Sequence, residues 1–253
     1  MAGYIGKVRF LADRTRPDIA VALGILSSEM KTTRPGMVEG VLNIFGYLKH
    51  SSALGLSFRS SNNYPVKLFG FCDASYNLEG DGSSRSGGCF YVSPNSGSIH
   101  SFSRKDHTVS HSSTEAEIKA IDEAIREIIF LREFLSDMAC VQDEPTVLFV
   151  DNRSAVELSN CLKTKNNVRH INVRSAFIRE QVNARTVEIC FVRGESNAAD
   201  ILTKPLPHNS RFFREWLMVG IPLDILNGLM KSDVWLHNKT NIHEDIFVEE
   251  HLY

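Results

Sequence analysis

The pattern of apolar and polar positions divides the chain into a helical first part and a longer part in which strands and helices alternate. Near the start, apolar residues recur at helical spacing after Pro17 and again after Pro35, and proline is common in the first turn of a helix. From about Tyr64 onward, short apolar runs bounded by turn residues predict strands, at "PVKLFGFCD", "SGGCFYVSP", "GSIHSFSRK", "PTVLFVD" and "TVEICFV". Helices are predicted from "HSSTEAE" to about Asp137, at "SAVELSN", at "INVRSAFIREQVNA" and from "SNAADILTK" onward.

The order of these elements, βββαβαβα, predicts an α/β fold with a mixed five-stranded sheet and helices packed on its faces. A short helical segment precedes this sheet. We therefore divide the chain into a helical segment at residues 1–62, an α/β domain at residues 63–215, and a C-terminal tail of unassigned structure at residues 216–253.

The composition is that of an ordinary globular protein, with 43% hydrophobic and 23% charged residues. No apolar run approaches the roughly 18 residues of a membrane-spanning helix, and the start "MAGYIGKVRF" lacks the apolar core of a signal peptide. We therefore expect an intracellular protein, in the cytoplasm or the nucleus. The 5 cysteines are odd in number and include no C-x-x-C pair, which favours reduced thiols over a disulfide or zinc framework.

The net charge of -2 hides an asymmetry along the chain. Residues 151–214 hold 11 Lys and Arg against 6 Asp and Glu, whereas residues 221–253 hold 2 against 6. A locally basic segment is compatible with a phosphate-backbone partner, although many such segments are plain solvated surface. Charge alone therefore supports a nucleic-acid partner only weakly.

Two of the predicted strands end on a carboxylate, "FGFCD" on Asp73 and "TVLFVD" on Asp151. In open α/β sheets, ligands bind beyond the carboxyl ends of strands, so neighbouring strands that end this way bring two carboxylates together. Taken singly, Asp151 in "DNRSAV" is also explained as a helix cap. Two hydrophobic strands that both end on a charge favour a shared site.

Glu115 and Glu117 in "SSTEAE" compete for a place in this site, and helix geometry separates them. Residues two positions apart point about 200° apart around a helix. Glu117 is in register with the apolar stripe that includes Ile121 and Ile128, whereas Glu115 pairs with Lys119 at i+4, as on a solvent-exposed face. Glu117 is therefore the predicted functional residue and Glu115 the predicted surface residue.

Asp200 in "SNAADILTK" is the fourth candidate, at a predicted helix start where the helix dipole also favours an ordinary acidic residue. Four carboxylates at one end of a sheet repel one another and raise one another's pKa values. Mg²⁺ resolves this conflict because it prefers oxygen ligands, and two such ions about 4 Å apart can activate a water and stabilise the leaving oxygen of a phosphodiester. The predicted cofactor is two Mg²⁺ ions, with Mn²⁺ as a substitute, held by Asp73, Glu117, Asp151 and Asp200.

The order Asp, Glu, Asp, Asp on these elements resembles that of ribonuclease H. The motifs "FCDASYN", "SSTEAEIKAIDEA", "VDNRSAV", "VRHINVRSAFIRE" and "AADILTKPLP" are similar to the ribonuclease H region of copia-type retrotransposon Pol polyproteins. Upstream, "LADRTRPDIAVAL" and "IFGYLKHSSALGLSF" resemble the segment that joins reverse transcriptase to ribonuclease H in those elements. The resemblance runs from about Ala12 to Gly220 and, as a set of motifs, is highly specific.

The resemblance implies hydrolysis of the RNA strand of an RNA–DNA hybrid. By analogy with the family, Asp73 bridges both metals, Asp200 helps to hold the ion that activates water, and the other two carboxylates hold the ion near the leaving oxygen. The hybrid would be recognised by its shape and 2′-hydroxyls without base specificity. Candidate phosphate contacts are Lys163, Lys165, Arg169 and Arg174, together with Arg85 and Ser86 in "GSSRSGG", which we expect to be a hairpin connector.

A second hypothesis keeps the fold but not the activity. No Y-x-D-D motif of a polymerase is present, so we do not expect a reverse transcriptase, and a polymerase domain outside this chain is a predicted partner. The chain resembles a fragment or a stranded genomic copy of such an element. The alternative function is therefore a catalytically idle, domesticated nucleic-acid-binding or assembly module.

Overall fold

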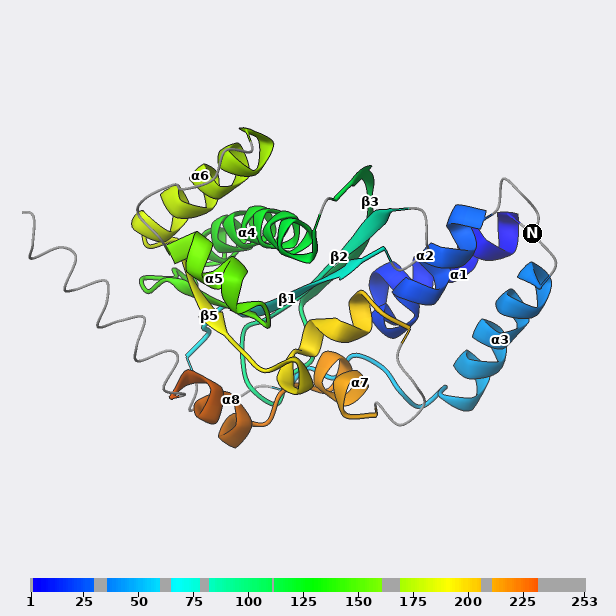
Figure 1. Ribbon diagram of the computed structural model, residues 1–253. Helices are drawn as coiled ribbons and strands as arrows, with labels where there is room; N and C mark the ends of the chain where they lie inside the picture. The colour runs from blue at the N-terminus through cyan, green and yellow to red at the C-terminus, as the bar shows by residue number, and fades with distance from the viewer. Residues whose placement is uncertain are drawn as a thin grey trace, which may run out of the picture.

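The protein is built around one mixed five-stranded sheet in the order β3-β2-β1-β4-β5 (Figure 1). The computed structural model describes residues 2–29, 36–59, 65–77, 82–110, 112–160, 169–205 and 211–231. The strands are β1 Phe69–Tyr76, β2 Ser83–Tyr91, β3 His100–Val109, β4 Thr146–Val150 and β5 Val187–Phe191. The first three pair antiparallel, whereas β4 pairs in parallel with both β1 and β5. The predicted α/β fold with a mixed sheet is confirmed.

Helices cover both faces of this sheet. On one face lie α4 Ser113–Asp137, α5 Arg153–Asn160 and α6 Arg169–Asn183 (Figure 1). On the other face lie a short 3₁₀ helix, η3 Ala198–Leu202, and the helices α7 Arg211–Met218 and α8 Leu223–Met230. Each face carries its own apolar core, so the strands are buried on both sides, as is typical of a sheet with parallel strands.

The long helix α4 forms where its periodicity predicts it. Ser112 caps it, because the Ser112 hydroxyl accepts a hydrogen bond of 3.1 Å from the backbone N–H of Glu115. The isoleucines Ile121, Ile125 and Ile128 recur at helical spacing and are completely buried against the sheet. This row of isoleucines therefore determines which side of α4 packs on the strands.

The segment "GSSRSGG" is not the loop that the sequence predicted. From Ser83 onward it lies inside β2, which pairs with β1 on one side and with β3 on the other. The reason is tertiary: small serine and glycine side chains fit a central strand that is covered on both faces, although their propensity favours turns. The prediction of a hairpin connector there was wrong.

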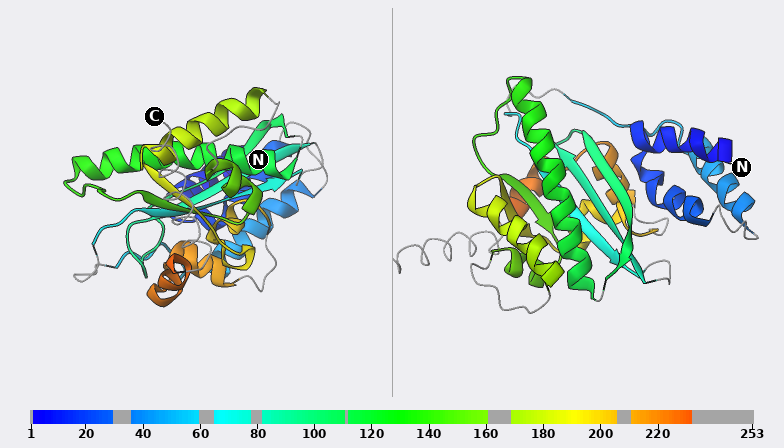
Figure 2. Two further views of the ribbon diagram at one scale, coloured as in Figure 1. Left: turned by 60° about the vertical axis from the view of Figure 1, so that its left-hand side comes forward. Right: turned by 90° about the horizontal axis from the view of Figure 1, so that it is seen from above.

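The N-terminal segment forms a small helical layer of its own beside the sheet. It contains α1 Ala2–Arg14, the 3₁₀ helix η1 Pro17–Ile19, α2 Ala20–Glu29 and α3 Met37–His50 (Figure 2). A separate apolar core joins these helices, with Val8, Ile19, Leu23, Val41 and Ile44 among its residues. The sequence predicted the helical character of this segment but not α1.

Side chains anchor this helical layer to the α/β part. The guanidinium of Arg214 on α7 lies 5.1 Å from the ring centre of Tyr47 on α3, a cation–π contact. Tyr47 also donates a hydrogen bond to Asp18, which in turn pairs with Arg16 at 2.8 Å. Arg85 of β2 lies directly under α2, where a side chain at Gly24 would approach its guanidinium to 2.6 Å.

The C-terminal helices belong to the core of the sheet. The boundary predicted at residue 215 falls inside α7, and Leu217, Ile221 and Leu226 are buried with the aromatic residues of β1 and β2. Gly220 between the two helices has φ +115 and approaches the backbone of Ser96 so closely that no side chain fits. The part of the predicted tail beyond residue 231 lies outside the described residues.

None of the helices in the described part of the chain combines the length and the apolar character that a bilayer crossing needs.

Candidate active site

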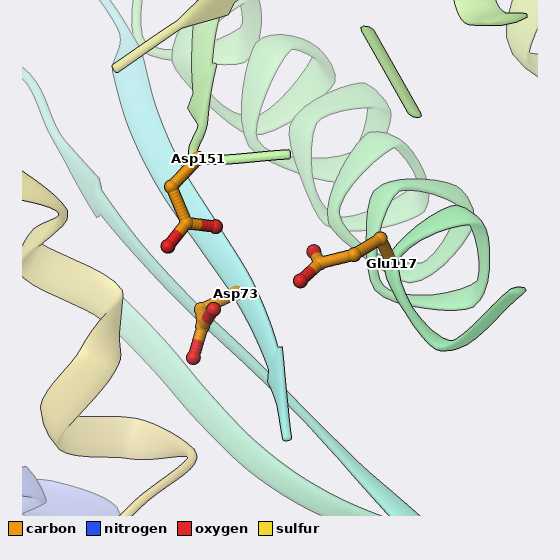
Figure 3. Close-up of side chains that lie close together, drawn as sticks. All are labelled: Asp73, Glu117 and Asp151. Atoms are coloured by element: carbon orange, nitrogen blue, oxygen red, sulfur yellow. The ribbon is translucent and has the colours of Figure 1, made fainter. Parts of the chain in front are cut away.

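Three carboxylates from three different elements converge at one end of the sheet. Asp73 comes from β1, Glu117 from the first turns of α4, and Asp151 from the residue that follows β4 (Figure 3). One oxygen of each lies within 4.8 Å of an oxygen of the others. The structure therefore brings together three of the four residues that the sequence singled out.

Strand pairing explains why Asp73 and Asp151 are neighbours. The parallel register of β1 with β4 ends at the pair Cys72 and Val150, so the next residue on each strand is a carboxylate. The sequence predicted that Asp73 ends its strand, and this prediction was wrong. Strand β1 continues to Tyr76 because β2 still pairs with it there. The end of the parallel pairing, and not the end of the strand, places Asp73.

Glu117 reaches the site because α4 approaches β1 closely. Three alanines, Ala74 on β1 with Ala116 and Ala120 on α4, form a small buried contact between the two elements. Glu117 is 6% exposed, and its Oε2 is buried with no hydrogen-bond partner. A buried carboxylate oxygen without a donor is costly unless a cation meets it.

Glu115 is not the surface residue that the sequence predicted. Its i+4 pair with Lys119 is present, with 3.7 Å between Glu115 Oε1 and Lys119 Nζ, but Glu115 is only 4% exposed. The end of β3 covers this pair, since Lys119 also contacts Asp106 at 3.0 Å and donates to Ser110 at 3.0 Å. Helix periodicity cannot show that a strand covers the second face. The preference for Glu117 over Glu115 agrees with the geometry of the cluster.

Asp200 lies beside the cluster of three and is joined to it by its neighbours. It sits on η3, a 3₁₀ turn, where the sequence predicted the start of an α-helix. The ammonium of Lys204 lies 2.8 Å from Asp200 Oδ1 and 3.2 Å from Asp73 Oδ2. The hydroxyl of Thr203 donates a hydrogen bond to the same Asp73 oxygen. The segment "DILTK" therefore supplies the carboxylate of Asp200 and two side chains, Thr203 and Lys204, that bind the carboxylate of Asp73.

Residues that the sequence analysis missed hold η3 against the strands. Asn197 is fully buried; its Nδ2 donates to the carbonyl of Cys72 at 3.0 Å, and its Oδ1 accepts from the N–H of Ala199 at 3.1 Å. Gly87 on β2 allows the close approach, because a Cβ there would lie 2.7 Å from Thr203 Cγ2. The signal for Lys204 was available in its i+4 spacing from Asp200. The contacts of Asn197 and Gly87 join distant segments and leave no such signal.

Burial and mutual repulsion perturb the acid groups. Asp73 is 1% exposed, and burial together with the charges of Asp151 and Asp200 raises its pKa to about 7, although Lys204 opposes this. Burial, and then the charges of Asp73 and Asp151, raise the pKa of Glu117 to about 9. The pKa of Asp151 is raised too, chiefly by burial. The positive charge of Lys204 therefore does not offset the burial and mutual repulsion of these carboxylates.

The cluster fits hard divalent cations. Its donors are all carboxylate oxygens, the ligands that Mg²⁺ and Mn²⁺ favour, and one of them lacks a donor partner. Asp73, Glu117 and Asp151 would hold an ion between them, and Asp200 lies near enough to Asp73 for both to contact the same ammonium.

The predicted nucleic-acid contacts are dispersed. Arg85 is 3% exposed and contacts Ser103 at 3.3 Å, and Ser86 is equally buried in β2, so neither faces solvent in this structure. Arg174 on α6 pairs with Asp122 at 3.2 Å and is half exposed. Lys163, Lys165 and the side chain of Arg169 lie outside the described residues. The basic contacts stay predictions.

The fold and the carboxylate cluster together define a ribonuclease H-like domain. No known protein-family model matches the chain. The chain is 33% identical over 206 residues to the retrovirus-related Pol polyprotein from transposon TNT 1-94 of Nicotiana tabacum, a match that covers 81% of this chain and 15% of the relative. The corresponding polyprotein from transposon RE1 of Arabidopsis thaliana is 28% identical over 204 residues, 81% of this chain and 14% of that one. The homologues of this chain are thus copia-type retrovirus-related Pol polyproteins, of whose length it spans about 15%.

A shorter relative has a different name. The chain is 34% identical over 128 residues to the secreted RxLR effector protein 161 of Plasmopara viticola, which is 50% of this chain and 87% of the relative. Among solved structures, the ribonuclease H1 LC11 isolated from compost is similar with a TM-score of 0.43 and 17% identity, over 54% of this chain and 92% of that one.

Proposed function

We propose that this chain hydrolyses the RNA strand of RNA–DNA hybrids with divalent metal ions held by Asp73, Glu117, Asp151 and Asp200. The observation that carries the proposal is the convergence of three of these carboxylates within 4.8 Å, with a buried Glu117 oxygen that has no hydrogen-bond partner. The similarity to copia-type Pol polyproteins supports the substrate class. The resemblance to ribonuclease H, which predicted these residues, supports the use of two ions.

The chemistry divides between the ions and the chain. Bound divalent ions supply a water of lowered pKa and positive charge at the phosphate, where they stabilise the leaving oxygen. The water oxygen would add to the phosphorus and lose a proton to solvent, while the bond to the 3′ oxygen breaks and that oxygen takes up a proton, which leaves a 5′-phosphate and a 3′-hydroxyl. The chain itself supplies rigid placement, since β1, β4 and α4 fix the carboxylates before substrate arrives.

Thr203 and Asn197 orient this site from the second face of the sheet. Thr203 donates a hydrogen bond to the carboxylate of Asp73, and Asn197 joins η3 to the carbonyl of Cys72, the residue before Asp73. Such supporting contacts fix the direction of metal-binding carboxylates.

Cleavage of a labelled RNA–DNA hybrid by the purified chain tests the proposal. With Mg²⁺ or Mn²⁺, we expect loss of the RNA strand only, with single-stranded RNA and duplex DNA left intact. Asp73→Asn and Glu117→Gln each reduce the rate by more than about 100-fold, because the loss of supporting contacts alone costs about 10–100-fold at metal sites. Glu195→Gln is the matched control, since Glu195 is an exposed acid on the neighbouring 3₁₀ helix, η2 Gly194–Ser196. Equal rates for all variants would rule the carboxylates out.

A polymerase domain is the proposed partner of the nuclease. The relatives are Pol polyproteins, of which the chain spans 15% in the case of TNT 1-94, and this similarity supports a polymerase domain as a second contact for the hybrid. We expect that addition of such a domain lowers the hybrid concentration needed for half-maximal cleavage and leaves the maximal rate unchanged.

The effector relative favours a second candidate function, a catalytically idle nucleic-acid-binding or assembly module. That relative shows that a stretch similar to half of this chain occurs in a protein that is not named as a polyprotein. Well-folded protein that retains hybrids on a filter and leaves them uncut in either metal would support this candidate over the nuclease.

A further inference from the structure

Lys204 lies where a cation would be expected between two of the acidic residues. It follows Asp200 at i+4, its backbone N–H donates to the Asp200 carbonyl at 3.0 Å, and its side chain turns back toward the sheet. There its ammonium contacts Asp200 Oδ1 at 2.8 Å and Asp73 Oδ2 at 3.2 Å. One ammonium therefore bridges two carboxylates that come from opposite ends of the α/β part of the chain.

The two sides of the site differ in what they already hold. On the side of Glu117 and Asp151, three carboxylates face one another and the buried Oε2 of Glu117 has no hydrogen-bond partner. On the side of Asp200, the Oδ2 of Asp73 already receives both the Lys204 ammonium and the Thr203 hydroxyl. A divalent ion that binds beside Glu117 and Asp151 contacts carboxylates that face one another. An ion that binds beside Asp200 is repelled by the ammonium of Lys204.

We propose that Lys204 is a built-in counter-cation, which holds Asp200 against Asp73 in the metal-free protein and competes with a divalent metal ion for that side of the site. This inference rests on the proposed function, because it concerns the same carboxylates. The two ions then bind with unequal affinity. The first binds at Asp73, Glu117 and Asp151, and the second binds only when the ammonium leaves. Lys204 is 39% exposed at its side chain, so it has solvent into which it can turn.

Like charges explain the direction of the effect. An ammonium and a divalent cation cannot both sit within contact distance of one Asp73 oxygen without strong repulsion, since the site is largely buried and weakly screened. Replacing Lys204 by a neutral side chain of similar length removes the competitor but also removes the charge that offsets the repulsion between Asp73 and Asp200. The metal-free protein should lose stability while its second metal site gains affinity.

Titration calorimetry with Mn²⁺ alone, in the absence of nucleic acid, tests this on the whole chain. We expect Lys204→Met to tighten the weaker Mn²⁺ by about 10-fold or more, because one charge within about 4–6 Å of a carboxylate shifts its proton binding by about 10-fold or more. Lys204→Arg keeps the charge and should bind Mn²⁺ as the unmodified chain does. Lys49→Met, at an exposed lysine on α3, is the matched control and should change nothing.

Melting temperatures, measured with a chelator and with saturating Mn²⁺, test the same inference if Lys204→Met is too unstable for calorimetry. Lys204→Met should melt lower than the unmodified chain with a chelator present and should gain more from saturating Mn²⁺. In an Asp200→Asn background, which lacks the second carboxylate, Lys204→Met should no longer tighten Mn²⁺ binding.

The outcomes separate this inference from the proposed function. If no variant binds Mn²⁺, the metal-dependent nuclease itself is contradicted. If the unmodified chain binds Mn²⁺ and Lys204→Met binds it with the same or lower affinity, the nuclease stands and the competing role of Lys204 is overturned.

Discussion

Gly87 on β2 lies directly opposite Asp73 on β1 in the antiparallel register, and a Cβ at Gly87 would lie 2.7 Å from Thr203 Cγ2 and 2.8 Å from Leu202 Cβ. The absence of a side chain at this one position lets η3 rest on the sheet beside Asp73. Asp200 and Lys204 reach Asp73 from η3 and its end, so Gly87 controls how near the fourth carboxylate comes to the other three.

Gly87→Ala should therefore damage the site through η3. We expect a loss of about 1–3 kcal/mol in the free energy of unfolding, as overpacked positions show, and a fall in hybrid cleavage because Asp200 moves away from Asp73. Gly46→Ala is the matched control: Gly46 lies inside α3 with no atom near its missing Cβ, so the same change should stabilise by about 0.5–1 kcal/mol. Urea denaturation measures both, and a Gly87→Ala protein of unchanged stability would contradict the argument.

Asn197→Ala should destabilise the protein by a different route. The change leaves the Cys72 carbonyl and the Ala199 N–H buried without their partner, at a cost of about 1–3 kcal/mol. Because the Cys72 carbonyl precedes Asp73, metal affinity should fall as well. Asn227→Ala on the exposed side of α8 should change stability by less than about 0.5 kcal/mol. Thermal denaturation with and without Mn²⁺ checks both effects.

Lys119→Met should be strongly destabilising, because it removes a buried cation from Asp106 and Glu115. Loss of one partner of a buried ion pair costs about 3–5 kcal/mol. Adding Glu115→Gln to Lys119→Met should recover part of this loss, since fewer negative charges then remain buried. A double-mutant cycle in urea measures the recovery. A purely additive cycle would show that the two side chains do not interact.

The stability of the metal-free protein should depend on pH through Asp73 and Glu117. Their pKa values rise on folding from about 4 to about 7 and about 9. Between these values the folded chain holds protons that the unfolded chain has released, so the free energy of unfolding falls as pH rises, by at most about 1.4 kcal/mol per pH unit for each group. The stabilisation is fully present below about pH 4 and is lost as pH rises through about 7 and about 9, the pKa values of Asp73 and Glu117 in the folded chain.

Saturating Mg²⁺ should reverse this trend, because the ionised carboxylates then bind the metal. Glu117→Gln should flatten the upper part of the profile in the absence of metal, whereas Glu195→Gln should leave it unchanged. Chemical denaturation at a series of pH values, with a chelator or with Mg²⁺, gives the profiles. A metal-free stability that rises from pH 5 to pH 8 would refute the assignment of these two groups.

Local patterns in the sequence were sufficient for most of the secondary structure and for the choice among the acids. Periodicity of 3.6 predicted α4 and placed Glu117 in register with the apolar stripe that packs on the sheet. The apolar runs before Asp73 and Asp151 identified two strands whose carboxylates meet. These features depend on residues near one another in the chain, so they can be derived without knowledge of the fold.

Contacts between distant segments were decided by the tertiary structure alone. Because propensity averages over environments, the serine- and glycine-rich stretch around Arg85 resembled a loop until its two strand partners were known. The burial of Glu115 with Lys119 depends on β3, and the place of Lys204 depends on how closely η3 packs on Gly87. The sequence by itself determined which residues carry the acid groups and that two of them follow the apolar runs of neighbouring strands. Only packing, which joins residues far apart in the chain, determined that the ammonium of Lys204 and the side-chain amide of Asn197 complete the site.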